Sequence, residues 1–212
     1  MTPRRLTLLL LALVVALALA VALVVSRGGP ASRDSSSTAA SEGTAASGFD
    51  GAAIPPSPPA PDFTLIDEAG HSVSLSGYRG RVVVLAFLYS TCGATCILIA
   101  QQIRGALDEL RRPVPVLIVS ADPTADTPAR IDRFLARVSL TGRVRYLTGS
   151  PARLDRVWRA YRVHPAAEGR ATFDKFAFLL LLDARGHERV LFAPEVLTPE
   201  ALAHDIGRLG GG

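Results

Sequence analysis

Two cysteines, the only two in the chain, lie four residues apart at Cys92 and Cys96. An apolar run precedes them and a helical pattern follows, which places both at a turn between a buried strand and a helix N-terminus. Unpaired backbone N–H groups and the helix dipole stabilise negative charge there, so the turn favours thiolates. A thiolate is the form of cysteine that attacks disulfides and binds soft metals. The sequence therefore predicts either redox exchange or soft-metal binding at this dithiol.

A structural disulfide or two buried thiols is the alternative for this pair. A bridge across so short a loop stabilises a fold less than a bridge across a long one. A domain of about 150 residues also buries enough surface to fold without such a bridge. Because residues i and i+4 lie on one side of a helical turn, both sulfurs are able to form a disulfide or hold one soft ion such as Cu(I). We therefore expect Cys92 and Cys96 to carry the chemistry of this chain, either as the redox-active pair or as the metal ligands.

The N-terminus predicts a membrane anchor. Residues 6–25 contain no charged residue, glycine or proline. Such a run is long enough to cross a bilayer as a helix and exceeds the apolar segment of a secretory signal peptide, roughly 7–15 residues. We predict an uncleaved signal anchor in residues 1–26, with a cleaved signal peptide as the alternative. Basic residues stay cytoplasmic, so Arg4 and Arg5 place the N-terminus in the cytoplasm. The protein would then cross the cell membrane once, with its domain on the extracytoplasmic side. Disulfides persist there.

The remaining chain divides into a linker and one domain. Residues 27–60 are rich in serine, alanine and proline and predict a tether without a core. Residues 61–212 are enough for one globular domain. The formal net charge is +4, but the sequence has no basic stripe with interleaved aromatic residues. We therefore expect no nucleic-acid partner.

The domain alternates predicted strands and helices. Apolar runs and alternating patterns predict strands at residues 61–67, 72–75, 81–88, 114–120, 143–147, 176–182 and 187–192. One helix is predicted from the cysteines to near residues 111–112. Three more are predicted after hydroxyl–proline pairs that would cap them, at residues 127–128, 150–151 and 198–199. This order predicts an α/β domain of the thioredoxin-like type, with a central mixed sheet flanked by helices. Trp158 and Tyr161 are expected in its core, and Asp122, Asp126 and Thr127 are expected to shape a turn and cap a helix.

Two motifs together resemble the Sco/SenC family. Residues 88–96 read LYSTCGATC, which resembles that family's CxxxC turn, and residues 119–128 read VSADPTADTP, which is similar to its strand-to-helix signature. The resemblance covers residues 61–210. It implies a membrane-tethered, thioredoxin-fold copper chaperone that helps to build the copper centre of cytochrome c oxidase, or a thiol–disulfide reductase. The metal site it implies is the two cysteines and a distant histidine. It also implies that the segment with Asp122, Asp126 and Thr127 lies near that site, so support of the metal ligands is the alternative to their role in a turn and a cap.

The chain departs from the family pattern at informative positions. Gly93 and Ile97 replace the prolines of the cysteine turn, and Lys175 occupies the position of the histidine ligand. An ammonium group has no lone pair for a metal. Near the sulfurs its charge would instead lower the pKa of a thiol, whereas the alternative is an ordinary surface lysine. His164 is the candidate substitute ligand, and the remaining histidines, His71, His187 and His204, are expected to be bystanders.

The expected function is copper delivery to, or thiol maintenance of, the copper centre of cytochrome c oxidase. Its partner would be the copper-bearing subunit of the oxidase or another exported thiol protein. In the redox version Cys92 would attack and Cys96 would resolve the mixed disulfide. The alternatives are a general extracytoplasmic thiol–disulfide oxidoreductase without a metal role, and an assembly factor that uses the disulfide only for structure.

Overall fold

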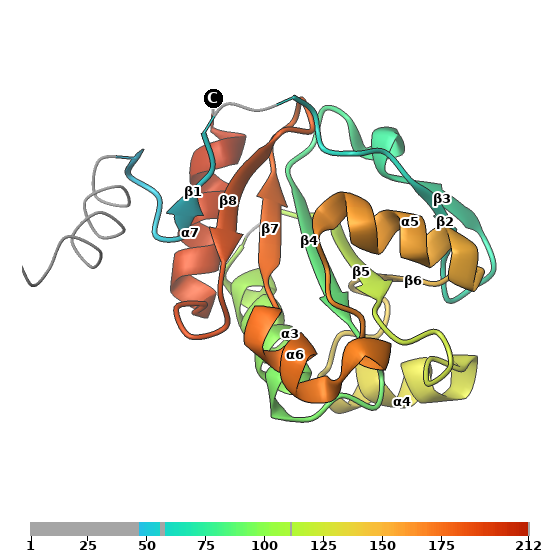
Figure 1. The fold of residues 1–212 in the computed structure, drawn as a ribbon. Coiled ribbons are helices and arrows are strands. Elements are labelled where there is room, and N and C mark those ends of the chain that lie inside the picture. Colours follow the sequence, from blue (N-terminus) through green and yellow to red (C-terminus); the bar gives the residue numbers. More distant parts are fainter. Residues whose placement is uncertain (1–46, 56–57, 111, 212) are drawn as a thin grey trace, which may run out of the picture. The chain divides into compact units, whose positions relative to one another are not determined.

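A six-stranded mixed sheet forms the centre of the domain (Figure 1). The computed structural model describes residues 47–55, 58–110 and 112–211. The strand order is β1-β8-β7-β4-β5-β6, in which β4, β5 and β6 are parallel and the other neighbours are antiparallel. The strands are β1 (Ala52–Ala53), β4 (Val83–Leu88), β5 (Val116–Ser120), β6 (Arg145–Leu147), β7 (Leu179–Leu182) and β8 (Glu188–Phe192). The predicted central mixed sheet is confirmed.

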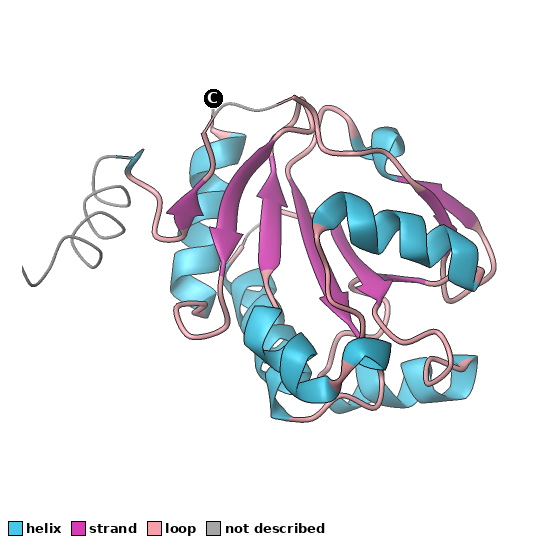
Figure 2. Ribbon diagram, in the orientation of Figure 1, coloured by secondary structure: helices cyan, strands magenta, loops and turns pink. Residues whose placement is uncertain are grey.

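Helices cover both faces of this sheet (Figure 2). The α-helices are α3 (Ala94–Glu109), α4 (Pro128–Arg137), α5 (Pro151–Tyr161), α6 (Arg170–Phe176) and α7 (Pro199–Gly210). Apolar residues of α3, α4, α6 and α7 share one core with one face of the sheet. The second core joins the other face to α5 and to a two-stranded hairpin, β2 (Thr64–Ile66) and β3 (Ser72–Ser74), which leads into the short 3-10 helix η1 (Leu75–Tyr78).

Strand β4 supplies side chains to both cores because successive residues of a strand point to opposite faces. Val84, Ala86 and Leu88 lie in the first core. Val83, Leu85 and Phe87 lie in the second. A strand covered on both faces must be apolar at every position, and all six residues of β4 are buried. This strand carries the cysteine turn at its C-terminal end, so the turn is attached to a fully buried strand.

The N-terminal edge of the sheet comes from the predicted linker. Within residues 27–60, strand β1 pairs with β8, and Phe49 packs in the first core. The carboxylate of Asp205 in α7 accepts the backbone N–H groups of Asp50 at 2.9 Å and Gly51 at 3.0 Å. These bonds tie the segment to the last helix, so the part of the chain that packs on the domain begins before residue 61.

Three helix starts were expected to carry a hydroxyl cap. Helices α4, α5 and α7 do begin at the predicted prolines, but only Thr198 caps through its side chain, accepting the N–H of Ala201 at 3.1 Å. The expected caps at Thr127 and Ser150 are wrong, because there the backbone carbonyl accepts the first helical bond and the hydroxyl does not.

Two further helical segments were not predicted. They are η2 (Ala166–Glu168) and α6, which meet at Gly169 with a φ of 118°. This backbone conformation strongly favours glycine. Among the described residues no helix has the length and apolar character needed to cross a membrane. The predicted anchor, residues 1–26, lies outside the described residues.

Candidate dithiol site

The two cysteines lie where strand β4 passes into helix α3, as predicted. Helix α3 begins at Ala94 after Gly93, so Cys92 is in the turn and Cys96 is in the first helical turn. The structure contains the Cys92–Cys96 disulfide, with the two Cα atoms 5.7 Å apart. No side chain caps Gly93, so the first N–H groups of α3 remain directed toward the turn. The site therefore has the positive helix end that stabilises a thiolate.

The disulfide lies at the edge of the first core. Cys92 has 7% of its surface exposed and Cys96 has none. Tyr89, three residues before Cys92, is also buried, and its ring meets that of Phe173 in α6 edge-on with centroids 5.0 Å apart. Burial raises the pKa of the Tyr89 hydroxyl, so this ring stays neutral. Of the two cysteines, Cys92 is therefore the more accessible to a partner.

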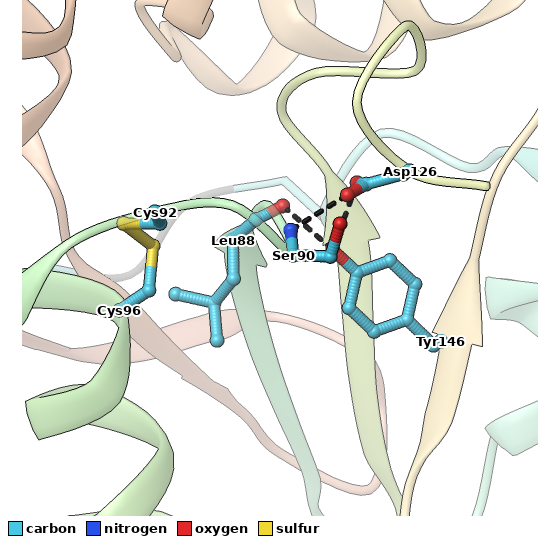
Figure 3. The surroundings of a disulfide bond; sticks show 6 residues. All are labelled: Leu88, Ser90, Cys92, Cys96, Asp126 and Tyr146. Carbon is cyan, nitrogen blue, oxygen red and sulfur yellow. Dashed lines mark hydrogen bonds between the residues drawn. A yellow bond between two sulfur atoms is a disulfide. The ribbon is translucent and has the colours of Figure 1, made fainter. Parts of the chain in front are cut away.

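A buried carboxylate lies behind the cysteine turn (Figure 3). Asp126 Oδ1 accepts the backbone N–H of Ser90 at 2.6 Å. Its Oδ2 accepts the hydroxyl of Ser120 at 2.6 Å and that of Tyr146 at 2.8 Å. The Tyr146 hydroxyl also lies 3.2 Å from the carbonyl oxygen of Leu88. These contacts join the C-terminal ends of β4, β5 and β6 at one carboxylate.

Burial dominates the ionisation of this cluster. It raises the pKa of Asp126 above its ordinary value, although the hydrogen bonds from Ser120, Ser90 and Tyr146 oppose the shift. Burial and then the charge of Asp126 raise the pKa of Tyr146 well above its ordinary value. Tyr146 is therefore a hydrogen-bond donor throughout the physiological range.

The strand-to-helix segment was expected to shape a turn and cap a helix. Asp122 does shape the turn, since its Oδ1 accepts the N–H groups of Thr124 at 3.2 Å and Ala125 at 3.1 Å. Asp126 caps no helix and bonds to the cysteine turn instead. The partner in that bond, Ser90, lies 36 residues earlier in the chain, so the local sequence around Asp126 does not reveal the contact. Trp158 and Tyr161 pack in or against the second core, as expected.

His164 and Lys175 both lie against Phe176. The His164 and Phe176 rings have centroids 4.8 Å apart, and Lys175 Nζ lies 5.3 Å from the Phe176 centroid. His164 Nδ1 is also 2.9 Å from Glu168 Oε2. Lys175 and Phe176 are exposed. The structure therefore brings the substitute ligand candidate beside the position that the resemblance assigns to the histidine ligand.

The other three histidines lie away from the cysteine turn. His71 and His187 stand 3.5 Å and 3.4 Å from Asp67 and Asp183 in hairpin turns. His204 lies between Asp50 and Asp205. In the described part of the chain, these three residues are the one group of side chains whose ligand atoms lie close enough together to hold a metal ion. Because Asp205 already accepts two backbone N–H groups, the arrangement is explained by the attachment of β1 to α7.

Comparison with known proteins places the chain in a family. The SCO1/SenC family matches residues 52–210. The bovine (Bos taurus) mitochondrial SCO2 homolog is 30% identical over 111 residues, covering 50% of this chain and 41% of that protein. The chain thus aligns with less than half the length of this curated relative.

Solved structures agree with this match. Copper-bound ScoI from Bradyrhizobium japonicum is 26% identical with a TM-score of 0.54, covering 71% of this chain and 98% of that one. Apo Sco1 from Thermus thermophilus, at 22% identity, has a TM-score of 0.62 and covers 76% of this chain and 96% of that one. The central sheet and its flanking helices are thus the fold of Sco proteins. This chain belongs to the SCO1/SenC family.

Proposed function

We propose that this protein is a membrane-anchored, extracytoplasmic Sco/SenC-like protein that delivers copper to, or maintains the thiols of, the copper centre of cytochrome c oxidase. The observation that carries the proposal is the Cys92–Cys96 pair at the start of α3 in a chain of the SCO1/SenC family. The anchor, residues 1–26, would hold the domain at the membrane surface, where an oxidase subunit presents its thiols.

The two sulfurs suit Cu(I) as cargo. Thiolates are soft ligands that select Cu(I), and the helix end favours their charged form. The ammonium group of Lys175 offers no lone pair, so the copper ligands would be the two cysteine sulfurs, with His164 as the candidate third ligand. The copper would leave by ligand exchange, as partner thiolates replace Cys92 and Cys96 one at a time. Copper-bound ScoI, at 26% identity, supports this reading.

The same pair supports a redox route. The Cys92 thiolate attacks one sulfur of a partner disulfide, forms a mixed disulfide, and the partner's other sulfur leaves as a thiolate. The Cys96 thiolate then attacks the Cys92 sulfur and releases the partner's second thiolate. Two electrons pass to the partner, and the Cys92–Cys96 disulfide forms. Cys92 is the attacking residue in this scheme because it is the more exposed of the two.

A general thiol–disulfide oxidoreductase without a metal role is the second candidate. The observation that favours it is Lys175, an exposed cation at the position of the family's histidine ligand. A cation beside a metal site disfavours metal binding by charge repulsion, whereas a cation beside a thiol favours the thiolate. Copper binding therefore separates the two candidates.

The deciding experiment is an anaerobic Cu(I) titration of the fully reduced, full-length protein against a competing chelator. The Cys92→Ser variant is run beside it, together with His164→Ala and a matched control, His71→Ala, which removes an exposed histidine far from the cysteines. Tight one-to-one binding that is lost in Cys92→Ser supports the copper route. Weakening in His164→Ala alone identifies the third ligand. Binding no tighter than that of Cys92→Ser rejects the copper route in favour of redox exchange.

A second arm tests whether the sulfurs act at all. The Cys92→Ser, Cys96→Ser double variant is expressed in cells that lack the wild-type protein, and oxidase assembly is measured. The proposal requires assembly to fail. If the double variant supports assembly as well as the wild type, the disulfide has only a structural role and both candidates are rejected.

A further inference from the structure

Asp126 is the buried charged group whose contacts reach the cysteine turn. Only 6% of its surface is exposed. It lies beyond the end of β5, yet its Oδ1 bonds to Ser90, two residues before Cys92. Its Oδ2 meanwhile holds the hydroxyls of Ser120 and Tyr146, from β5 and β6. One side chain thus connects the cysteine turn to the two strands beyond β4.

The turn between β4 and α3 is fixed at two backbone positions. The N–H of Ser90 donates to Asp126 at 2.6 Å, and the N–H of Cys92 donates to the carbonyl of Tyr89 at 3.0 Å. The Ser90 hydroxyl adds a third bond, to the carbonyl of Ala125 at 3.3 Å. Of these three bonds, the first is the shortest and the only one to an ionisable acceptor. A hydrogen bond to a carboxylate is roughly twice as strong as one between neutral groups.

A helix cap would be the ordinary use of an aspartate before a Thr–Pro helix start, but Asp126 does not serve in that way. Helix α4 begins without a side-chain cap, and both Asp126 oxygens are directed at other groups. In the view of Figure 3, Asp126 and Tyr146 approach the Leu88–Ser90 backbone from one side, and the disulfide lies on the other. The burial of this carboxylate opposes its charge, and the hydrogen bonds that it accepts offset that effect only in part.

We propose that Asp126 is a positioning residue of the dithiol, which fixes the turn at Ser90 so that the Cys92 sulfur is held within bonding reach of Cys96. The inference deepens the proposed function and rests on dithiol chemistry at these cysteines, not on the identity of the partner. A turn that is already ordered loses less conformational freedom when the ring closes, so the disulfide is favoured over the open dithiol. Asp126 would therefore hold the reduction potential of the pair at a more negative value than the turn alone would give.

The test measures this closing equilibrium directly. Two thiols of the protein and one glutathione disulfide give the Cys92–Cys96 disulfide and two glutathione thiols, with two electrons transferred. The full-length wild type, Asp126→Asn and Asp126→Ala are equilibrated in glutathione buffers, quenched with a thiol-reactive tag, and scored as open or closed. Asparagine keeps a neutral acceptor for the Ser90 N–H, whereas alanine keeps none.

The closing constant is the equilibrium constant for formation of the Cys92–Cys96 disulfide from the open dithiol in this exchange. We expect it to be largest in the wild type, smaller in Asp126→Asn and smallest in Asp126→Ala. We expect the alanine variant to close about tenfold less favourably, which is about 30 mV for a two-electron couple. The matched control is Asp67→Asn. Asp67 is a buried carboxylate too, 4% exposed, and it also accepts backbone N–H groups, but in the turn between β2 and β3. Its closing constant should equal that of the wild type.

Two results would overturn the inference. One is a closing constant for Asp126→Asn within about twofold of the wild type while the variant remains folded. The other is an equal shift in Asp67→Asn, which would mean that general loss of stability moves the potential. If Asp126→Ala does not fold, the comparison of Asp126→Asn with Asp67→Asn decides alone. If the wild-type pair itself does not cycle between open and closed forms, the proposed function fails, a result distinct from the failure of the role of Asp126.

Discussion

The ring of Phe173 lies edge-on against Tyr89 with centroids 5.0 Å apart, which attaches helix α6 to the residue that leads into the cysteine turn. Phe173 is 2% exposed and is the one buried residue of α6. An edge-to-face contact of this kind adds to the stabilisation that comes from burial of the ring. The attachment of α6 therefore depends on this side chain.

The variant Phe173→Ala should lose about 3–5 kcal/mol of unfolding free energy, the usual cost of removing a buried phenylalanine. Detachment of α6 should also expose the Cys92 sulfur, so the rate of disulfide reduction by dithiothreitol should rise. Denaturant unfolding and the reduction rate measure the two effects. The neighbouring variant Phe176→Ala removes a ring that is 48% exposed and should change the unfolding free energy by less than about 1 kcal/mol. Equal effects of the two variants would contradict the assigned role of Phe173.

Asp205 should be essential for the edge strand β1. Its buried carboxylate accepts the N–H groups of Asp50 and Gly51, so Asp205→Ala leaves two donors without that acceptor. An unsatisfied buried donor costs about 1–3 kcal/mol. Only the Gly51 bond is fully buried and the Asp50 bond is partly exposed, so we expect a total loss of about 2–4 kcal/mol. Hydrogen exchange at residues 49–53 should become faster than in the wild type.

His204→Ala is the control for this prediction. His204 is half exposed and contacts the same two aspartates, and exposed ion pairs contribute about 0–1 kcal/mol. Protection of residues 49–53 that survives in Asp205→Ala, or is lost equally in His204→Ala, would show that Asp205 does not hold the strand.

Asp67 gives a pH dependence of stability with a definite sign. Burial raises its pKa, but the backbone N–H groups of His71 and Ala69 outweigh burial and hold the pKa below the ordinary value of 3.8. The native state therefore favours the carboxylate, and this stabilisation is present above pH 3.8 and is lost as the pH falls through the native pKa. The unfolding free energy of Asp67→Asn should lie furthest below the wild type at neutral pH, and the gap should close on acidification.

Asp126 should show the opposite pH dependence. Its pKa is raised by burial, so the native state binds the proton more tightly than the unfolded chain. Its contribution to stability is largest below the ordinary value of 3.8 and falls as the pH rises from there to the raised native pKa. The wild type should therefore lose stability relative to Asp126→Asn across this interval. Urea unfolding from pH 3 to 8, followed by the fluorescence of the single tryptophan, Trp158, measures the unfolding free energy of the wild type and both variants. If the difference from the wild type changes with pH in the same direction for Asp67→Asn and Asp126→Asn, the assignment is refuted.

Much of the fold is predictable because its strongest signals are local. Strand β4 is apolar throughout, and helix α3 repeats its apolar residues at helical spacing, so both follow from a short window of sequence. Helix α6 has one buried residue in seven and no side-chain cap, so it has neither an apolar stripe nor a start signal. Strand β1 has two residues, and its partner β8 lies more than a hundred residues further along the chain.

The cysteines could be predicted as the site, and the family resemblance placed the segment with Asp126 near them, but the bonds behind the cysteines could not be predicted. Cys92 and Cys96 are marked by their type, their spacing and the strand before them. The bond from Ser90 to Asp126 joins residues 36 positions apart, and the bond from Tyr146 comes from a third strand. The local pattern around Asp126, with Thr127 and proline after it, indicates a helix cap, and that interpretation is wrong because tertiary contacts use both carboxylate oxygens.

Lys175 gives the sharpest prediction for metal binding. The family resemblance places a histidine ligand at this position, in a helix that packs beside the cysteine turn through Phe173. Because imidazole is a good ligand for copper and ammonium is none, Lys175→His should raise Cu(I) affinity by at least about tenfold, which is about 1.4 kcal/mol. Competition with a chelator under anaerobic conditions measures the change. Lys175→Gln is the matched control, since it removes the charge without adding an imidazole. An equal gain in the glutamine variant would mean that charge repulsion, and not a missing ligand, limits copper binding. No gain in either variant would place residue 175 out of reach of the two sulfurs.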